Sequence, residues 1–439
     1  MTYLFALLLL AMVLALAFEE KIHAKKSLIT GVTAVVALFM GSFFGIFDLS
    51  HASGHMPFFI PFIDWDVILI ILGSSLFVDI VSQSGIFSWT AISLTRLSKG
   101  DPVRLLGFYA ILTVLFSAFL NNVTAMIIVG SLTAVSLARL EQQDKLLGFL
   151  LTEGLLTNIG GLLTLISSVP NIIVGQRAGI SFLSFFLMAA PYVVVATGAT
   201  LWMAKTIFGI QGLKTLEEKE AAALKVQAFD PRDGIESQGF FVFSWCMFVL
   251  LILLFALDSV LPVFKDLGLG FLAMAFAFIV LIKYKHDVDK NYKALDWDLL
   301  FFFATLFCVI GVMEAAGVLH LIGEGISSLI ALGPTAGPMA LLWGSAIMSS
   351  VTDNIPLAAM LANILGNMDQ VPAALWWCVI FGANLGGNIT PIGSASTVVA
   401  VTIIHKNKIK LSFMQFVKQA VPFAFVQLLI ASGYIWLRF

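Results

Sequence analysis

The chain has 439 residues, of which 60% are hydrophobic and only 11% are charged, with a formal net charge of −2. An ordinary soluble domain carries about 25% charged and 45–50% apolar residues. So few charges cannot cover a water-soluble surface of this size, which excludes a soluble enzyme, a disordered chain and a nucleic-acid-binding protein. The three cysteines lie inside apolar runs and offer no disulfide or zinc framework. The composition predicts a multi-pass membrane protein whose partner is the lipid bilayer.

A helix needs about 20 mostly apolar residues to span a bilayer. Such segments lie at about 3–18, 28–48, 67–86, 146–177, 181–207, 239–260, 267–283, 298–318, 372–404 and 412–437. Two pairs of shorter apolar stretches, 103–120 with 123–138 and 337–352 with 355–367, have a polar break between their members. We expect each pair to form a re-entrant hairpin. The first segment lacks the basic start and cleavage site of a signal peptide, so we expect it to be retained as a helix.

The positions of Lys and Arg predict the orientation, because cytoplasmic loops carry the excess of positive charge. With the N-terminus outside, 21 of the 24 Lys and Arg residues fall on the cytoplasmic side, and only Arg177, Lys265 and Arg438 fall outside. The polar segment 208–238 is then a cytoplasmic linker between two halves, 1–207 and 239–439. We expect the cell (inner) membrane as the location.

The two halves resemble each other at nearly constant offsets. The Ile-Asp-Trp-Asp segment 63–66 returns 232 positions later as Leu-Asp-Trp-Asp at 295–298, and Asn-Ile-Gly-Gly at 158–161 returns 226 positions later as Asn-Leu-Gly-Gly at 384–387. Each half has about five spans and one hairpin, and an odd number of crossings reverses the second half. The predicted fold is therefore all-α with two inverted repeats, each with one re-entrant hairpin and one broken helix, as in secondary transporters.

Polar side chains gather at four matched places inside these apolar segments, namely the two hairpin turns and the two interrupted spans at 166–171 and 392–397. Carbonyl and hydroxyl oxygens at such breaks suit a small cation such as Na⁺, and helix N-termini suit an anion. The candidate ion- or substrate-binding residues are Asn121, Asn122, Thr124, Asn158, Thr164, Ser167, Ser168, Asn171, Asp353, Asn354, Asn384, Thr390, Ser394, Ser396 and Thr397.

Isolated acids at membrane depth indicate a functional site. Asp353 at the second hairpin turn and Glu153, five residues before Asn158, are the candidates for proton coupling. Protonation of a carboxylate competes with cation binding, and no Lys or Arg lies within the predicted site, so the first interpretation is cation/proton antiport. The alternative is transport of an anion or oxyacid, such as a carboxylate or arsenite, held by half-helix N-termini. An enzyme is not expected, since the sequence has no H-E-x-x-H pair and none of its six histidines falls in the core of a predicted span.

At these segments the sequence resembles the ion transporter superfamily, in particular ArsB/NhaD-type permeases with their P protein-like and citrate transporter-like members. Residues 117–124 and 353–356 are similar to the hairpins of this family, and 157–172 and 386–394 to its broken helices. The resemblance implies coupling to Na⁺ or H⁺ with no organic cofactor, a scaffold part that forms a homodimer, and a transport part that slides like an elevator. The first hairpin has Asn121 where many members have Asp, so one carboxylate of the family pattern is missing.

Overall fold

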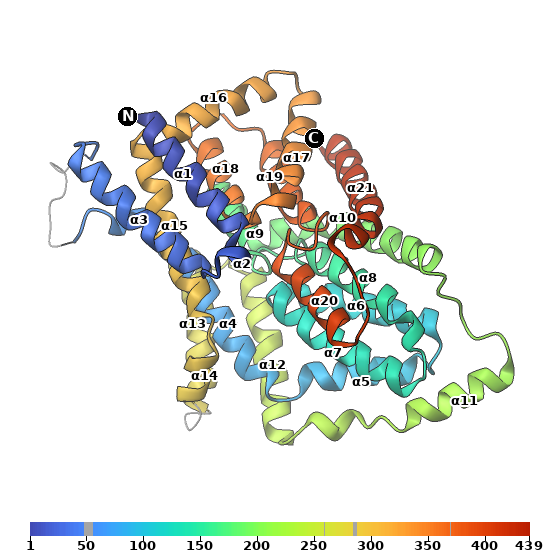
Figure 1. The fold of residues 1–439 in the computed structure, drawn as a ribbon. Helices are drawn as coiled ribbons and strands as arrows, with labels where there is room; N and C mark the ends of the chain where they lie inside the picture. Colours follow the sequence, from blue (N-terminus) through green and yellow to red (C-terminus); the bar gives the residue numbers. More distant parts are fainter. Residues whose placement is uncertain (48–55, 259, 284–287, 369) are drawn as a thin grey trace.

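The computed structural model describes residues 1–47, 56–258, 260–283, 288–368 and 370–439 (Figure 1). Over these ranges the chain forms helices joined by turns without a strand, which confirms the predicted all-α polytopic class. Nine helices of the described ranges are long and apolar enough to cross a membrane. They are α3 (Lys26–Phe43), α4 (Trp65–Ser82), α6 (Pro102–Phe119), α7 (Asn122–Arg139), α10 (Phe182–Ile207), α12 (Gln238–Ala256), α13 (Pro262–Lys283, of which Asp266–Lys283 qualifies), α15 (Trp297–Ala315) and α21 (Phe413–Arg438).

Shorter helices fill the space between these spans. They are α1 (Thr2–Ala17), α2 (Glu19–Ile22), α5 (Ile86–Leu97), α8 (Leu146–Gly160), α9 (Val169–Arg177), α11 (Leu216–Gln227), α14 (Val288–Ala294), α16 (Val318–Ile330), α17 (Ala336–Val351), α18 (Asn354–Gly366), α19 (Ala373–Gly386) and α20 (Ala395–Lys406). Short 3-10 helices are η2 (Ile60–Phe62), η3 (Gln143–Lys145) and η4 (Pro231–Gly234).

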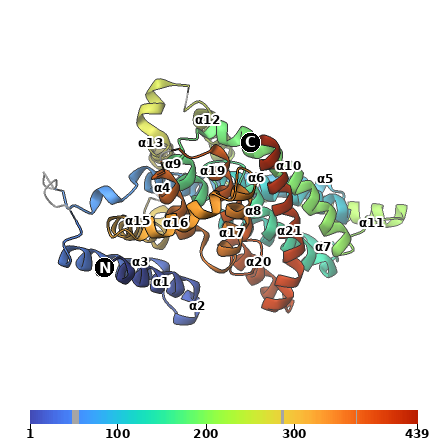
Figure 2. The same ribbon diagram turned by 90° about the horizontal axis from the view of Figure 1, so that it is seen from above.

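The helices form two groups, which Figures 1 and 2 show side by side. The arm contains α1, α3, α4, α13 and α15, where α4 packs along α13 and α15 packs along α3. The body contains α6 to α10 and α17 to α21. We use the names arm and body for these two groups throughout.

Contacts in one half of the chain have counterparts in the other. The first hairpin, α6 with α7, packs on α8, and the second hairpin, α17 with α18, packs on α19. The short helix that follows each break packs against the other half of the chain. The helix α9 of the first half lies against α18 and α19, and α20 of the second half lies against α7 and α8. Such paired contacts are what the predicted repeat requires, while the inverted orientation of the two halves stays a prediction.

Matched sequences begin matched helices. Asp64 caps α4 by accepting a hydrogen bond from the Val67 amide at 3.2 Å, and Asp296 caps α15 in the same way at 3.0 Å from the Leu299 amide. Aspartate is favoured at this position because it satisfies an amide that has no partner within the helix. Gly85, just before α5, has a φ of 84°, a left-handed conformation that glycine adopts without strain.

The structure differs from the sequence predictions in three boundaries. The breaks lie at 161–168 and 387–394, slightly before the predicted interruptions at 166–171 and 392–397. Pro170 lies in the first turn of α9, where its missing amide costs no hydrogen bond, so it starts a helix rather than ending one. The predicted linker 208–238 contains the helix α11, which begins at a capping box between Thr215 and Glu218. The hydrogen bonds from the Thr215 and Lys214 amides hold the pKa of the Glu218 carboxyl below its usual range.

The crossing of α4 and α13 provides a test of this packing. A Cβ atom on Gly73 would lie 2.6 Å from the backbone of Ala273 and Met274, so Gly73→Val must push the two helices apart. We expect the variant to lose about 1–3 kcal/mol of stability and to show a lower Tm in detergent. Gly198→Ala in α10, where the added Cβ meets open space, is the control. Equal Tm values for the two variants would contradict the described crossing.

Candidate functional site

The two broken helices meet through their matched asparagines. Asn158 in α8 donates from Nδ2 to the Ser394 hydroxyl at 3.0 Å, and Ser168 donates to the Asn384 amide oxygen at 2.7 Å. Ser394 and Ser168 are the N-cap residues of α20 and α9. Each exchanged half-helix therefore begins at an asparagine of the other half, and both asparagines are fully buried.

The first break is closed by its own side chains. Asn171 donates from Nδ2 to the carbonyls of Gly161 and Thr164 at 2.6 and 3.0 Å, and Ser167 donates to the same carbonyls at 2.5 and 2.8 Å. The Asn171 amide oxygen accepts a hydrogen bond from Asn384 at 2.9 Å. These bonds matter because carbonyls freed inside a membrane protein need partners within the protein.

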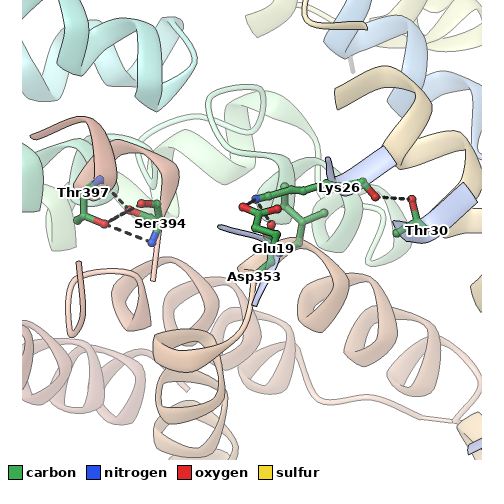
Figure 3. Close-up of polar contacts among 7 residues, drawn as sticks. Glu19, Lys26, Thr30, Asp353, Ser394 and Thr397 are labelled. Carbon is green, nitrogen blue, oxygen red and sulfur yellow. Dashed lines mark hydrogen bonds and ion pairs between the residues drawn. The ribbon is translucent and has the colours of Figure 1, made fainter. Parts of the chain in front are cut away.

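The second break joins the other side of the cluster. Ser394 and Thr397 form a capping box at the start of α20, and Figure 3 shows their hydrogen bonds. Ser396 donates to the Asn158 amide oxygen at 3.4 Å, and Thr157 donates to the Ser396 hydroxyl at 2.9 Å. We call Asn158, Ser168, Asn171, Asn384, Ser394 and Ser396 the central cluster.

The hairpins are attached to the breaks by threonine side chains. Thr390 donates to the Ser350 carbonyl at 2.6 Å, and Thr164 donates to the Ala118 carbonyl. Asn122 reaches the cluster by donating to Asn158 at 3.4 Å. Each hairpin therefore has a fixed position relative to one break.

Some of the predicted residues at the hairpin turns are not joined to the central cluster. Asn121 caps α7 by accepting from the Val123 amide at 2.8 Å. In the described part of the chain, no side-chain hydrogen bond links Thr124 or Asn354 to the cluster. These two remain half-buried at the hairpin turns.

Asp353 has a basic partner, contrary to the prediction that no Lys or Arg lies within the site. Its carboxylate forms an ion pair with Lys26 at the start of α3, and Lys26 also lies 3.8 Å from Glu19. Figure 3 shows the Asp353 carboxylate facing Lys26, with Ser394 and Thr397 on the other side. Lys26 is among the basic residues that the sequence predicts on the cytoplasmic side, and only the packing of the arm on the second hairpin brings it to Asp353.

A chain of amides beyond the predicted residues extends the cluster. Asn158 donates to Asn388 at 2.8 Å, Asn388 donates to Gln427 in α21 at 2.8 Å, and Gln427 donates to Thr200 in α10 at 3.0 Å. A signal for Gln427 was present, since it is a polar residue in the apolar span 412–437. Asn388 was overlooked because its counterpart in the first half, Leu162, is apolar.

The electrostatic character of the cluster follows from its helix ends. The N-termini of α9 and α20 meet there, and those of α7 and α18 begin at the two hairpin turns. Helix N-termini carry a partial positive charge and unpaired amide donors. The residues that form the central cluster are all uncharged. In the described ranges, no three His, Cys, Asp or Glu side chains gather into a metal site.

Comparison with known protein families shows to which family the chain belongs. A family model described as a citrate transporter matches residues 12–382. The chain belongs to the citrate transporter family. It is a multi-pass membrane transporter.

Relatives of this citrate transporter family member are themselves named as transporters or membrane proteins. The uncharacterised transporter Mb2703 of Mycobacterium bovis is 30% identical over 427 residues, which cover 96% of this chain and 95% of that protein. The P protein of Homo sapiens is 26% identical over 456 residues, which cover 86% of this chain and 54% of that protein.

Solved structures share the fold. The YdaH transporter of Alcanivorax borkumensis superposes with a TM-score of 0.56 at 14% identity, over 84% of both chains. MtrF of Neisseria gonorrhoeae, described with a class of antimetabolite efflux pumps, gives 0.51 at 15% identity, over 84% of this chain and 81% of that one. These likenesses concern the fold alone.

The amide chain of this citrate transporter family member provides a second test. Gln427→Leu removes the acceptor of Asn388 and leaves a buried amide without its partner, so we expect a loss of about 1–3 kcal/mol of stability. Thermal unfolding in detergent measures the loss. Gln227→Leu, at the exposed end of α11, is the control. An unchanged Tm for Gln427→Leu would show that the amide chain is not formed.

Proposed function

We propose that the transporter moves a small carboxylate or a related oxyanion, coupled to Na⁺ or H⁺, with the body sliding against the arm. The observation that carries this proposal is the buried, uncharged central cluster, where two half-helix N-termini meet. Amide donors at such ends suit an anionic group. The central cluster contains no acidic side chain that would repel an anion. The nearby carboxylate of Asp353 is paired with Lys26.

The description of the family supports the same choice. The matching model is described as a citrate transporter, and citrate carries carboxylates. The cluster offers amide NH₂ groups from Asn158, Asn171 and Asn384, together with the hydroxyls of Ser168 and Ser394. These donors are now bound to other cluster side chains or, for Asn171, to backbone carbonyls of the first break, so a substrate carboxylate would replace hydrogen bonds within the protein.

Cation/proton antiport is the second candidate, and Glu153 is the observation that favours it. Glu153 is fully buried in α8, one helical turn before the central cluster. Carbonyls of the first break would supply the hard oxygen ligands that Na⁺ prefers once Asn171 and Ser167 release them. With Asp353 engaged by Lys26, antiport in this conformation would depend on Glu153 alone. The N-terminus-out orientation and the homodimer stay predictions.

The sliding motion is supported by the few polar contacts between arm and body. Lys26 of α3 binds Asp353 of the second hairpin, and Gln176 at the end of α9 donates to Asp66 of α4. Asn367 at the end of α18 donates to Glu314 of α15 at 3.0 Å. Within the arm, α4 packs closely along α13 and α15 along α3. Movement of the body along the arm would break these three polar contacts and leave the paired helices of each group together.

Transport by the purified protein in liposomes tests the proposed substrate. We expect uptake of radiolabelled citrate or succinate under an imposed Na⁺ or H⁺ gradient. Asn158→Ala and Asn384→Ala should weaken it about tenfold or more, because hydrogen bonds to a charged group contribute about 1.5–3 kcal/mol. Asn407→Ala, at the exposed end of α20, is the control. Sodium-driven proton release without carboxylate uptake would replace the proposal with antiport.

Cross-linking tests the sliding motion. In a variant whose three native cysteines are replaced by serine, Lys26→Cys with Asp353→Cys should cross-link rapidly, and substrate with coupling ion should slow the reaction. The matched control is Thr2→Cys with Ala316→Cys, because Thr2 donates to the Ala316 carbonyl at 2.9 Å within the arm. That pair should cross-link equally under all conditions. Movement of the body against the arm would be contradicted if substrate and coupling ion slowed the cross-linking of both pairs equally. It would also be contradicted if they slowed the cross-linking of neither pair.

A further inference from the structure

A buried carboxylate lies between the central cluster and one surface of the body. Glu153 has no exposed surface, and its Oε1 atom accepts a hydrogen bond from the Thr133 hydroxyl at 2.6 Å. Its Oε2 atom is buried without a hydrogen-bond partner among the described residues. A buried carboxylate oxygen without a hydrogen-bond donor is costly inside a membrane protein, so it requires a proton or a cation.

The surroundings of Glu153 favour the proton. Tyr109 on α6 is the titratable side chain that faces it, α7 presents Thr133, and α20 presents Ala400 against the adjacent Gly154. Within the described ranges, no Lys, Arg or His side chain pairs with Glu153, and no second carboxylate faces it. A single carboxylate with one hydroxyl and apolar neighbours supplies too few oxygens for Na⁺.

A column of buried hydroxyls connects this region to a surface loop. The Tyr109 hydroxyl lies 2.7 Å from Thr95 of α5 and 2.8 Å from Ser136 of α7. Thr95 lies at the end of α5, where Ser98 donates to its carbonyl at 2.6 Å and accepts from the Gly100 amide at 3.1 Å. The loop at 98–101 contains Lys99 and is on the side that the sequence predicts to be cytoplasmic.

The column reaches Glu153 through α7 and continues to the cluster through α8. Ser136 and Thr133 are three residues apart on α7, so they lie on the same face in successive turns. Thr157 lies one turn beyond Glu153 on α8 and donates to Ser396 of the central cluster. Glu153 therefore occupies the position between the surface loop and the candidate substrate site.

The second half of the chain lacks this column. At the offsets that relate the two halves, the positions of Tyr109, Thr133, Ser136 and Glu153 correspond to Leu341, Leu365, Met368 and Val379. All four corresponding residues are apolar, although the hairpins and breaks around them are matched. Thr95 alone has a polar counterpart, Ser327. Packing inherited from a repeat would give similar residues in both halves, so the part of the column from Tyr109 to Glu153 meets a requirement of the first half alone.

We propose that Glu153 binds the coupling proton at Oε2, and that Thr95, Tyr109, Ser136 and Thr133 pass this proton between the 98–101 loop and Glu153. The inference rests on the proposed ion-coupled transport and names the coupling ion and its site. In each transfer a hydroxyl accepts one proton and gives up another, so the column is unchanged. Glu153 alone changes from carboxylate to carboxylic acid. The step from Ser136 to Thr133 spans one helical turn and requires a side-chain rotation or a bridging water.

Infrared spectroscopy of the purified protein tests the site without requiring transport. Lowering the pH should produce the C=O band of a protonated carboxylic acid, and Glu153→Gln should lack this band. Thr133→Val keeps Glu153 but removes the hydrogen bond to Oε1, so it should shift the band and assign it even if Glu153→Gln does not fold. A band that is unchanged in both variants would overturn Glu153 as the proton site.

The kinetics of the same band test the route. After a rapid pH drop, we expect the rate at which Glu153 is protonated to be at least about tenfold lower in Tyr109→Phe. The reason is that the phenolic hydroxyl is the relay between Thr95 and Ser136. Tyr434→Phe is the matched control, since that hydroxyl donates to the Met188 carbonyl at 2.7 Å outside the column. Equal rates in the two variants would overturn the route. If the bands behave as expected but no carboxylate is taken up, the proton site stands and the proposed substrate fails.

Discussion

Backbone groups that are freed inside a membrane must find partners within the protein, and this requirement shapes the centre of the molecule. Breaking α8 from α9 and α19 from α20 releases carbonyls and amides where neither lipid nor bulk water can bind them. Asn171 and Ser167 bind the carbonyls of the first break, and Ser394 with Thr397 caps the helix after the second. The polar side chains therefore stabilise the broken backbone first, and the same groups provide the donors that a substrate could use.

The exchange of half-helices between the two halves follows from the same requirement. The N-cap serines of α9 and α20 bind asparagines of the opposite half, so neither break is complete without the other. A substrate that enters between Asn158 and Asn384 would act on both breaks at once. The site is thus a property of the two halves together, and neither half could form it alone.

The sequence was sufficient for the fold class and for the location of the breaks, but it did not predict which side chains bind one another. Composition and span length predicted an all-α membrane protein, and the repeated Asn-x-Gly-Gly and Ser-containing segments predicted the breaks, because those patterns are local. The Lys26–Asp353 pair was not predicted, because Lys26 precedes an apolar run, as a loop residue does, and lies 327 positions from its partner. Gln427 was missed for a related reason: a single polar residue in a span does not show which neighbour it binds.

The pairing of Lys26 with Asp353 has a consequence for the energetics of the transport cycle. Lys26 lies 3.8 Å from Glu19 and beside Asp298, so it keeps negative neighbours if the hairpin leaves. Asp353 has no second cation among the described residues, and a carboxylate that leaves its partner inside the protein costs several kcal/mol unless an ion replaces the partner. Separation of the body from the arm would then be favourable only after Asp353 has taken up a proton or a metal cation. The ion pair would therefore hold the body against the arm until a second cation, in addition to the proton at Glu153, neutralises Asp353.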